Sequence, residues 1–183
     1  MDFFELVQKR KSVRKFESKA VPMSAIEKIM NAARLAPSWR NRQSWKFILV
    51  TDSALKKQLI QCTDSFNQAW LGGEFAIVVA CGDPRRSGVR DGLPYFMVDA
   101  AIAMEHLVLA ATELGLGACW ISAFNEEKVK KLLEIPEHIR VVALSPLGYP
   151  AKKDSLAGAI ARKVVKSKNR KPLNEVYTLN KWE

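Results

Sequence analysis

FMVDAAIAMEHLVLAATEL, residues 96–114, is an alanine-rich stretch that suffices for about five helical turns. Its apolar residues fall on most sides of the helix that they predict; those available for packing are Met97, Ala100, Ala101, Met104, Leu107, Val108 and Ala111. A helix that is hydrophobic nearly all round is buried in the protein rather than laid on its surface. We therefore expect a central helix, which Gly115 and Gly117 bring to an end.

The segments on either side of this helix predict a mixed fold in one domain. Ser24–Glu27 reads as a capping box that starts a helix, and Pro37 ends that helix. Periodicity and composition predict further helices at 2–11, 53–61 and 125–133, and strands at 45–51, 75–80, 119–121 and 141–147. The fully apolar strand at 75–80 suits the interior of a sheet covered on both faces. The order of elements predicts a single α+β domain over residues 1–183, with helices around one sheet.

The last part of the chain, 150–183, has no regular periodicity but is not a simple polar tail. It keeps five large apolar side chains among its charges: Leu173, Val176, Tyr177, Leu179 and Trp182. A disordered segment rarely carries so many. We expect this arm to lie in a groove, for instance on a partner subunit.

Charge and composition restrict the function without naming it. A formal net charge of +10 implies attraction to anions, so that nucleic acid, a nucleotide cofactor and a membrane surface all remain open. The three cysteines are far apart and lie among apolar residues, which predicts reduced, buried thiols and no metal site. The N-terminus does not look like a signal peptide, and no apolar run approaches the ~20 residues of a membrane span. These features favour a soluble, cytoplasmic protein.

Three segments carry side chains suited to chemistry. Arg10–Arg14 offers two guanidinium groups and a hydroxyl, which suit a phosphate but also an ordinary basic surface. Pro37–Trp45 combines amides, hydroxyls and indoles that suit the edge and face of a heteroaromatic ring, or else form a plain surface loop. In Gly115–Phe124 the glycines permit a tight turn and close backbone approach, although a lone GxG is no nucleotide signature.

Taken together, these segments resemble the nitroreductase family of FMN-dependent oxidoreductases over nearly the whole chain. The resemblance rests on RKSVRKF from Arg10, APSWRNRQSW from Ala36, GLGACWISAF from Gly115 and KNRKPL from Lys168, with LSPLGYPAKK between the last two. It implies a nitroreductase-like fold, in which a central, mostly antiparallel sheet is flanked by helices. It also implies a homodimer with shared active sites, in which the C-terminal extension packs on the partner subunit.

The resemblance also implies which residues hold FMN. Arg10 and Ser12, with Lys11 between them, are similar to phosphate and ribityl ligands, and Arg14 to the cation at the flavin N1 and O2 edge. Lys168 and Arg170 match a C-terminal phosphate-binding pair. The remaining positions are a loop donated across the dimer interface, a ring-contacting amide, and a stretch beside flavin N5: Pro37, Ser38, Trp39, Asn41 and Gln43; Asn67; and Trp120, Ile121, Ser122 and Ala123.

Two positions depart from the family pattern. Ser44 stands where proline is common, and Ser122 replaces a more usual glycine or glutamate. The chain has only two histidines, His106 and His138, and both fit structural or solvated positions better than catalytic ones. No general base or other catalytic side chain is therefore assigned, and the chemistry is left to flavin N5.

The activity that the resemblance implies is ping-pong transfer of hydride from NADH or NADPH, through FMN, to a nitroaromatic, quinone or similar acceptor. An oxidative or dehalogenating flavoenzyme of the same family is the main alternative. A flavin-binding regulator without turnover also stays open. A basic nucleic-acid-binding protein would explain the lysines, but the chain has no helix-turn-helix, zinc-finger or RNP-like pattern. We expect no nucleic-acid or membrane partner.

Overall fold

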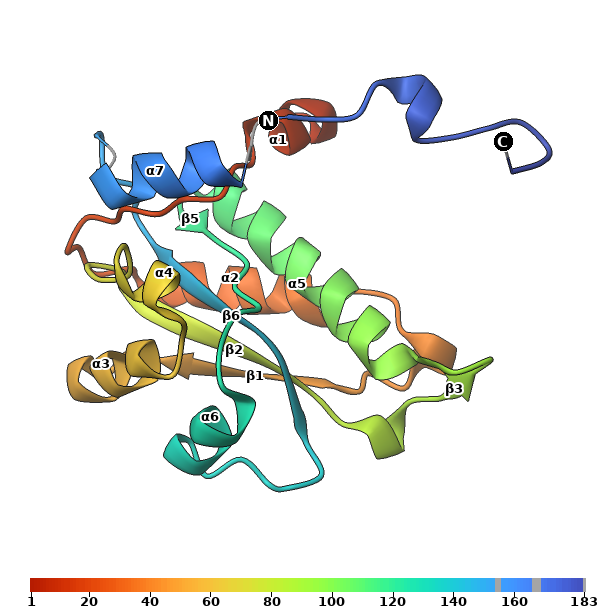
Figure 1. Ribbon diagram of the computed structural model, residues 1–183, viewed down its shortest axis with the longest axis horizontal. Helices are drawn as coiled ribbons and strands as arrows, with labels where there is room; N and C mark the ends of the chain where they lie inside the picture. Colours follow the sequence, from red (N-terminus) through yellow and green to blue (C-terminus); the bar gives the residue numbers. More distant parts are fainter. Residues whose placement is uncertain (154–155, 166–168, 183) are drawn as a thin grey trace.

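A four-stranded sheet forms the centre of the molecule (Figure 1). The computed structural model describes residues 1–153, 156–165 and 169–182. The strands lie in the order β1 (Trp45–Val50), β2 (Ala76–Gly82), β6 (Arg140–Gly148) and β5 (Gly117–Ala118), and each adjacent pair is antiparallel. The α+β class and the mostly antiparallel sheet are thus confirmed.

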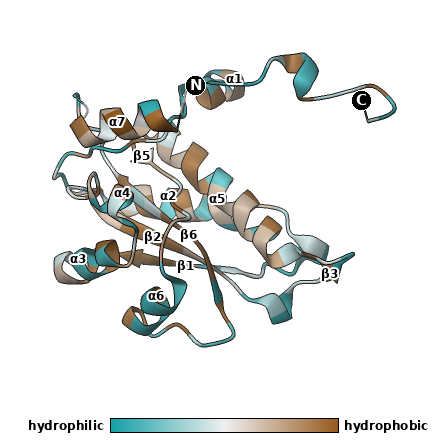
Figure 2. Ribbon diagram, in the orientation of Figure 1, coloured by the Kyte–Doolittle hydropathy of each residue, from teal (hydrophilic) through white to brown (hydrophobic). Residues whose placement is uncertain are grey.

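Helices cover both faces of this sheet because the residues of its central strand alternate between two cores. On β2, Val78 and Ala80 pack towards α2 (Met23–Arg34) and α5 (Tyr95–Glu113). Ile77 and Val79 belong to the opposite core, under α3 (Ser53–Gln61) and α6 (Glu126–Leu132). Figure 2 shows hydrophobic residues along β1 and β2 and hydrophilic residues on α6. The fully apolar sequence of β2 is therefore explained by burial on both sides.

The central helix is α5, as the alanine-rich stretch predicts. Its small residues Ala100, Ala103 and Ala111 are fully buried, which lets α2 approach closely. The ring nitrogen Nδ1 of His106 lies 3.3 Å from the carbonyl oxygen of Ala32 on α2, so this histidine joins two helices. By length and composition alone α5 could cross a membrane, but one face of the helix is buried against α2 and the sheet.

Several boundaries differ from the expectations. The capping box at Ser24–Glu27 is wrong: α2 begins at Met23, and its N-cap is Pro22, which makes no side-chain cap. The predicted strand at 119–121 is also wrong, because β5 ends at Ala118 and Ile121 makes only one bridge, to Leu144 on β6. Residues 119 and 120 form no strand pairing, so the ladder is not continuous.

The C-terminal part contains a helix that periodicity should have revealed. α7 (Leu156–Val164) has apolar residues at helical spacing, and of these Ala161 is buried against the α3–α6 core while Leu156 and Ile160 are exposed. Beyond it, residues 169–182 are exposed and include the short helix η3 (Leu173–Glu175). Figure 1 shows this arm leaving the body of the domain past α1 (Phe3–Lys9). Its docking on a partner subunit stays a prediction.

The remaining elements are short and were not expected. They are η1 (Trp39–Asn41), α4 (Ser65–Gln68), η2 (Pro84–Arg86), and a small hairpin of β3 (Val89–Arg90) and β4 (Leu93–Pro94). The three cysteines are buried and free, as predicted. Burial and the nearby Glu126 carboxylate raise the pKa of the Cys81 thiol to about 11. This thiol therefore stays protonated at neutral pH.

An ion pair between α6 and β6 should make stability depend on pH. Hydrogen bonds from Arg140 at 2.8 and 2.9 Å, and from the backbone of Val141 at 2.8 Å, hold the pKa of Glu126 below its usual range. A depressed carboxyl pKa stabilises the fold at neutral pH, and this stabilisation is lost as the pH falls through the folded-state value. Arg140 is largely exposed, which limits the gain.

Glu126→Gln should therefore destabilise the protein by about 1 kcal/mol at pH 7. Urea unfolding at pH 7 and again near pH 3 measures this difference. Wild type and variant should converge at the acidic pH, because both then carry a neutral side chain. An equal difference at both pH values would contradict the assignment.

Candidate functional site

The N-terminal basic segment lies directly against the segment that follows the central helix. Ser12 forms a parallel bridge with Ala118, and the backbone N–H of Val13 donates to the Ala118 carbonyl at 2.9 Å. Gly117 makes this approach possible: a Cβ atom added there would lie 2.6 Å from the Val13 side chain. The close backbone approach expected of these glycines is thus present at Gly117.

Arg14 comes out of this contact half-buried and incompletely paired. Its guanidinium carbon lies 5.9 Å from the centre of the Trp70 ring. Within the described residues, Arg14 Nη1 and Trp70 Nε1 are buried donors without hydrogen-bond partners. An unpaired buried donor costs about 1–3 kcal/mol, which an acceptor oxygen supplied by a ligand would recover. This pair fits a ligand that carries carbonyl or phosphate oxygens, as FMN does.

Asn67 reaches the same region from α4. The helix is capped by Asp64, whose side chain accepts from the Asn67 backbone N–H at 2.9 Å. The Asp64 N–H in turn donates to the Ala123 carbonyl at 3.2 Å. The Asn67 residue is 8% exposed. The chain therefore brings Asn67 and the 120–123 stretch side by side.

The 120–123 stretch itself presents an open edge. Trp120 is 42% exposed and Ser122 and Ala123 are exposed, while Ile121 is buried in the core. Just before them, burial raises the pKa of the Cys119 thiol, and Arg14, the Ser12 hydroxyl and Arg10 act against that rise. The guanidinium groups of Arg14 and Arg10 thus both act on the pKa of Cys119, so the side of the site next to Cys119 carries positive charge.

The loop 37–43 lies elsewhere in the same chain. Arg40, Asn41 and Gln43 have positive φ angles of 48°, 55° and 48°, a conformation that non-glycine residues seldom adopt. The Ser38 hydroxyl accepts from the Gln43 N–H at 2.9 Å, and the Asn41 and Gln43 amides bond to each other at 3.0 Å. The exposed loop therefore holds its two amides in a defined geometry.

The loop and the basic segment sit at opposite ends of α5. The Trp39 N–H bonds to Asp99 near the start of this helix, whereas the amino group of Met1 pairs with Glu113 at its end, at 3.4 Å. The 14 residue steps from Asp99 to Glu113 correspond to about 21 Å along the helix axis. One chain thus joins the Arg10–Arg14, Asn67 and Trp120–Ala123 segments and keeps loop 37–43 apart from them (Figure 1).

The last predicted segment gives less information. Lys168 lies outside the described residues. Arg170 is exposed and donates to the Asn169 carbonyl at 2.7 Å, and Lys11 is exposed on the other basic segment. The convergence of Arg10 and Arg170 on one phosphate therefore stays a prediction.

Sequence analysis missed two residues that the structure brings to the site. Trp70 follows a helix too short to be seen by periodicity, although its proximity to Asn67 in the sequence was a signal. Asp99 interrupts the apolar pattern of α5, and a carboxyl group on a buried helical face indicates a polar partner. One partner is Ser44, whose hydroxyl donates to it at 3.0 Å. The hydrogen bond to Asp99 thus gives a structural reason for serine at position 44, where proline is common in the family.

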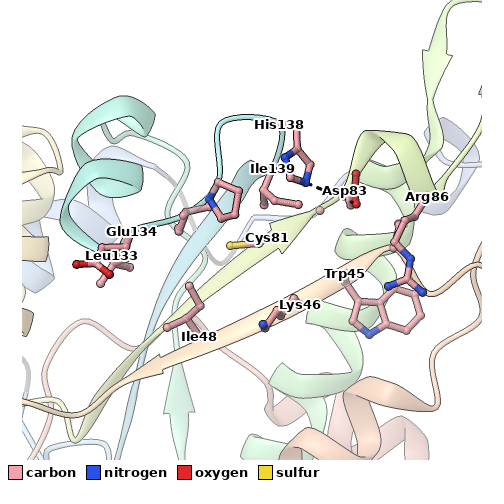
Figure 3. A pocket seen from close by; sticks show the side chains of 14 residues that line it. Trp45, Lys46, Ile48, Cys81, Asp83, Arg86, Leu133, Glu134, His138 and Ile139 are labelled. Carbon is pink, nitrogen blue, oxygen red and sulfur yellow. Dashed lines mark ion pairs between the residues drawn. The ribbon is translucent and has the colours of Figure 1, made fainter.

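A separate pocket of about 340 Å³ opens on the α6 side of the sheet (Figure 3). It lies between Trp45 and Ile48 on β1 and Ile135, Pro136 and Ile139 before β6. At its rim His138 Nε2 lies 4.0 Å from an Asp83 carboxyl oxygen. Its lining includes none of the residues predicted to hold FMN. We therefore do not assign it to the candidate site.

Comparisons with known proteins agree on one family. The model of the nitroreductase family matches residues 7–68 and 61–149. A protein of Archaeoglobus fulgidus, provisionally named NADH dehydrogenase/NAD(P)H nitroreductase, is 38% identical over 152 residues, which cover 80% of this chain and 84% of that protein. An iodotyrosine deiodinase of Thermotoga neapolitana is 26% identical over 163 residues, covering 80% and 88%.

Solved structures give the same result. A nitroreductase family protein of Clostridium novyi NT superposes with a TM-score of 0.79 at 43% identity, covering 83% of this chain and 87% of that one. An FMN-dependent nitroreductase of Clostridium difficile R20291 superposes with a TM-score of 0.74 at 27% identity, covering 88% and 96%. The matched residues include the segments that meet around Arg14 as well as the loop before β1. The chain therefore belongs to the nitroreductase family.

Proposed function

We propose that this protein is an FMN-dependent oxidoreductase that passes hydride from NAD(P)H, through FMN, to a nitroaromatic, quinone or similar small acceptor by a ping-pong mechanism. The observation that carries this proposal is the meeting of the Arg10–Arg14, Asn67–Trp70 and Trp120–Ala123 segments around the half-buried Arg14, whose Nη1 is buried without a hydrogen-bond partner. The cofactor and reductant in the names of the relatives support it.

The roles of the side chains follow from their chemistry. FMN, when bound, supplies a ring that takes up and releases hydride at N5. Arg14 would donate to the oxygen edge of that ring and stabilise negative charge there. Arg10, Ser12, Lys168 and Arg170 would hold the phosphate and ribityl groups, and Asn67 would bond the ring edge. Trp120 and Ser122 would border the open face, where reductant and acceptor bind in turn.

The same proposal includes a homodimer in which loop 37–43 completes the site of the partner subunit. The separation of this loop from Arg14 along α5 supports it. So do exposed apolar side chains near the two termini, which monomers seldom leave uncovered: Phe3, Phe4, Val7, Leu156, Ile160, Leu173, Val176, Tyr177, Leu179 and Trp182. We propose a cytoplasmic location, with no nucleic-acid or membrane partner.

Rapid mixing of purified, FMN-loaded protein with NADH or NADPH under anaerobic conditions tests the first half-reaction. The absorbance of the oxidised flavin should disappear and return when a quinone or nitroaromatic is added. Persistence of the oxidised band with both reductants would reject the reductive proposal. A protein that binds no FMN would reject the flavoenzyme proposal altogether.

Arg14→Leu should weaken FMN binding by about tenfold or more, because it removes a charged donor from a buried position. Titration of the apoprotein with FMN, followed by quenching of flavin fluorescence, measures the dissociation constant. Lys15→Leu, one residue further on, is the matched control, since Lys15 is exposed. An unchanged dissociation constant for Arg14→Leu would place the ring edge elsewhere.

Dehalogenation is a second candidate because the Thermotoga neapolitana relative is named a deiodinase. Incubating the reduced protein with a halogenated phenol and measuring halide release separates the two. Halide release that outpaces quinone reduction would favour the second candidate.

A further inference from the structure

Asp99 is a buried carboxyl group on the central helix to which three separate segments are attached. It is 1% exposed and lies on the first turns of α5. One oxygen accepts from the Trp39 backbone N–H at 2.7 Å. The other accepts from the Ser44 hydroxyl at 3.0 Å and the Ser87 hydroxyl at 2.9 Å. The Asp99 side chain therefore holds residues at both ends of loop 37–43, Trp39 and Ser44, and also Ser87 before β3.

The Trp39 ring is fixed by the same arrangement. It packs on Gly88 so closely that a Cβ atom added there would lie 2.5 Å from the ring. The Arg40 guanidinium carbon lies 4.7 Å from the ring centre, and the Tyr95 ring lies 6.5 Å away. These neighbours all belong to the same chain, so the indole packs between the loop and the residues that flank the β3–β4 hairpin.

What this anchoring holds in place is a strained segment. Arg40, Asn41 and Gln43 adopt left-handed backbone conformations, each of which costs free energy for a residue with a side chain. Such a segment persists only when surrounding contacts determine it. The hydrogen bonds to Asp99 lie immediately before and after it, at Trp39 and Ser44.

We propose that Asp99 is a positioning residue that preorganises the exposed Asn41 and Gln43 amides for binding the flavin of the partner subunit. This inference rests on the proposed function, in which loop 37–43 completes the partner's site. Without the Asp99 carboxyl, Trp39 N–H, Ser44 and Ser87 lose their acceptor and the loop samples other conformations. Ordering it again upon binding then weakens the affinity for FMN.

Asp99→Ala and Asp99→Asn test the proposal by their FMN dissociation constants and by hydrogen exchange of the loop amides. Asp99→Ala should raise the FMN dissociation constant about tenfold and accelerate exchange at Trp39. Asp99→Asn should stay within about threefold of wild type, because the amide oxygen still accepts from Trp39 and the two hydroxyls rotate to accept from the amide nitrogen. Ser44→Ala provides a milder variant if Asp99→Ala does not fold.

Ile29→Val is the matched control for stability. Ile29 is fully buried on α2, away from the loop, so that this change lowers stability without touching the anchor. Its FMN dissociation constant should equal that of wild type. Wild-type FMN affinity in both Asp99→Ala and Ser44→Ala, or equal weakening in Ile29→Val, would overturn the proposal. Wild type that binds no FMN would instead refute the proposed function itself.

Discussion

Mixing two inactive variants is expected to restore about a quarter of the wild-type activity, because exchange gives half heterodimers with one intact site each. The first variant is Arg14→Leu, and the second is the double change Asn41→Ala and Gln43→Ala in the loop. In one chain, the residues just before Arg14 pair with Ala118 beyond the end of α5, whereas the loop is bonded to Asp99 near its start. If each flavin is bound by Arg14 of one subunit and the loop of the other, a heterodimer contains one site with neither change.

The matched control mixes two variants whose changes both affect the site of their own chain. Arg14→Leu with Asn67→Ala should stay inactive after mixing, because both residues serve the site of their own chain and every site keeps one defect. Steady-state quinone reduction is measured at an FMN concentration near the wild-type dissociation constant, at which altered sites stay largely empty, and native mass spectrometry counts the heterodimers. Heterodimers without recovered activity in the first mixture would show that the loop does not serve the partner's site.

Gly117→Ala is expected to displace segment 12–14 and so to lower both the stability of the protein and its affinity for FMN. Its new methyl group would lie 2.6 Å from the Val13 side chain, so that the segment 12–14 must move away from β5. Overpacking of this kind costs about 1–3 kcal/mol. Because Ser12 and Arg14 move with Val13, the affinity for FMN should fall by about tenfold or more as well. Urea unfolding and FMN titration measure the two effects.

The double variant Val13→Ala and Gly117→Ala tests whether the steric clash with the Val13 side chain causes both effects. Removing the two Val13 methyl groups makes room for the new one, so FMN affinity should return to within about threefold of wild type. Gly115 is a different case: its φ of +74° is the reason for glycine, and no atom lies within 4 Å of an added Cβ. Failure of the double variant to recover any affinity would refute the packing explanation.

Much of the architecture was predictable because the pattern of burial is local. The alanine-rich stretch predicted α5, and the residues of β2 predicted a strand covered on both faces. Helix ends were predicted less well. The prediction at Ser24 failed because Pro22, with its fixed φ, starts the helix earlier. α7 was overlooked although Leu156, Ile160 and Val164 have helical spacing, because charged residues are frequent in the rest of the arm.

The residues of the candidate site also fall into two groups, those that the sequence predicted and those that only the structure revealed. Arg14, Asn67 and Trp120 could be named from the family resemblance, since their motifs are contiguous in the sequence. Trp70 and Asp99 could not, because each acts through a partner far away in the chain: Arg14 in one case, Trp39 and Ser44 in the other. The lone acidic residue on a buried helical face was the signal that sequence analysis passed over.

The sequence by itself determined the family, the α+β class, the buried central helix and the residue types that suit a flavin, because these depend on composition and spacing along the chain. Only the tertiary structure decided which segments meet. It placed Arg14 beside Trp70 and Ser12 beside Ala118, and it kept loop 37–43 at the other end of α5. The physical reason is that a rigid helix sets distances between groups that spacing in the sequence does not reveal.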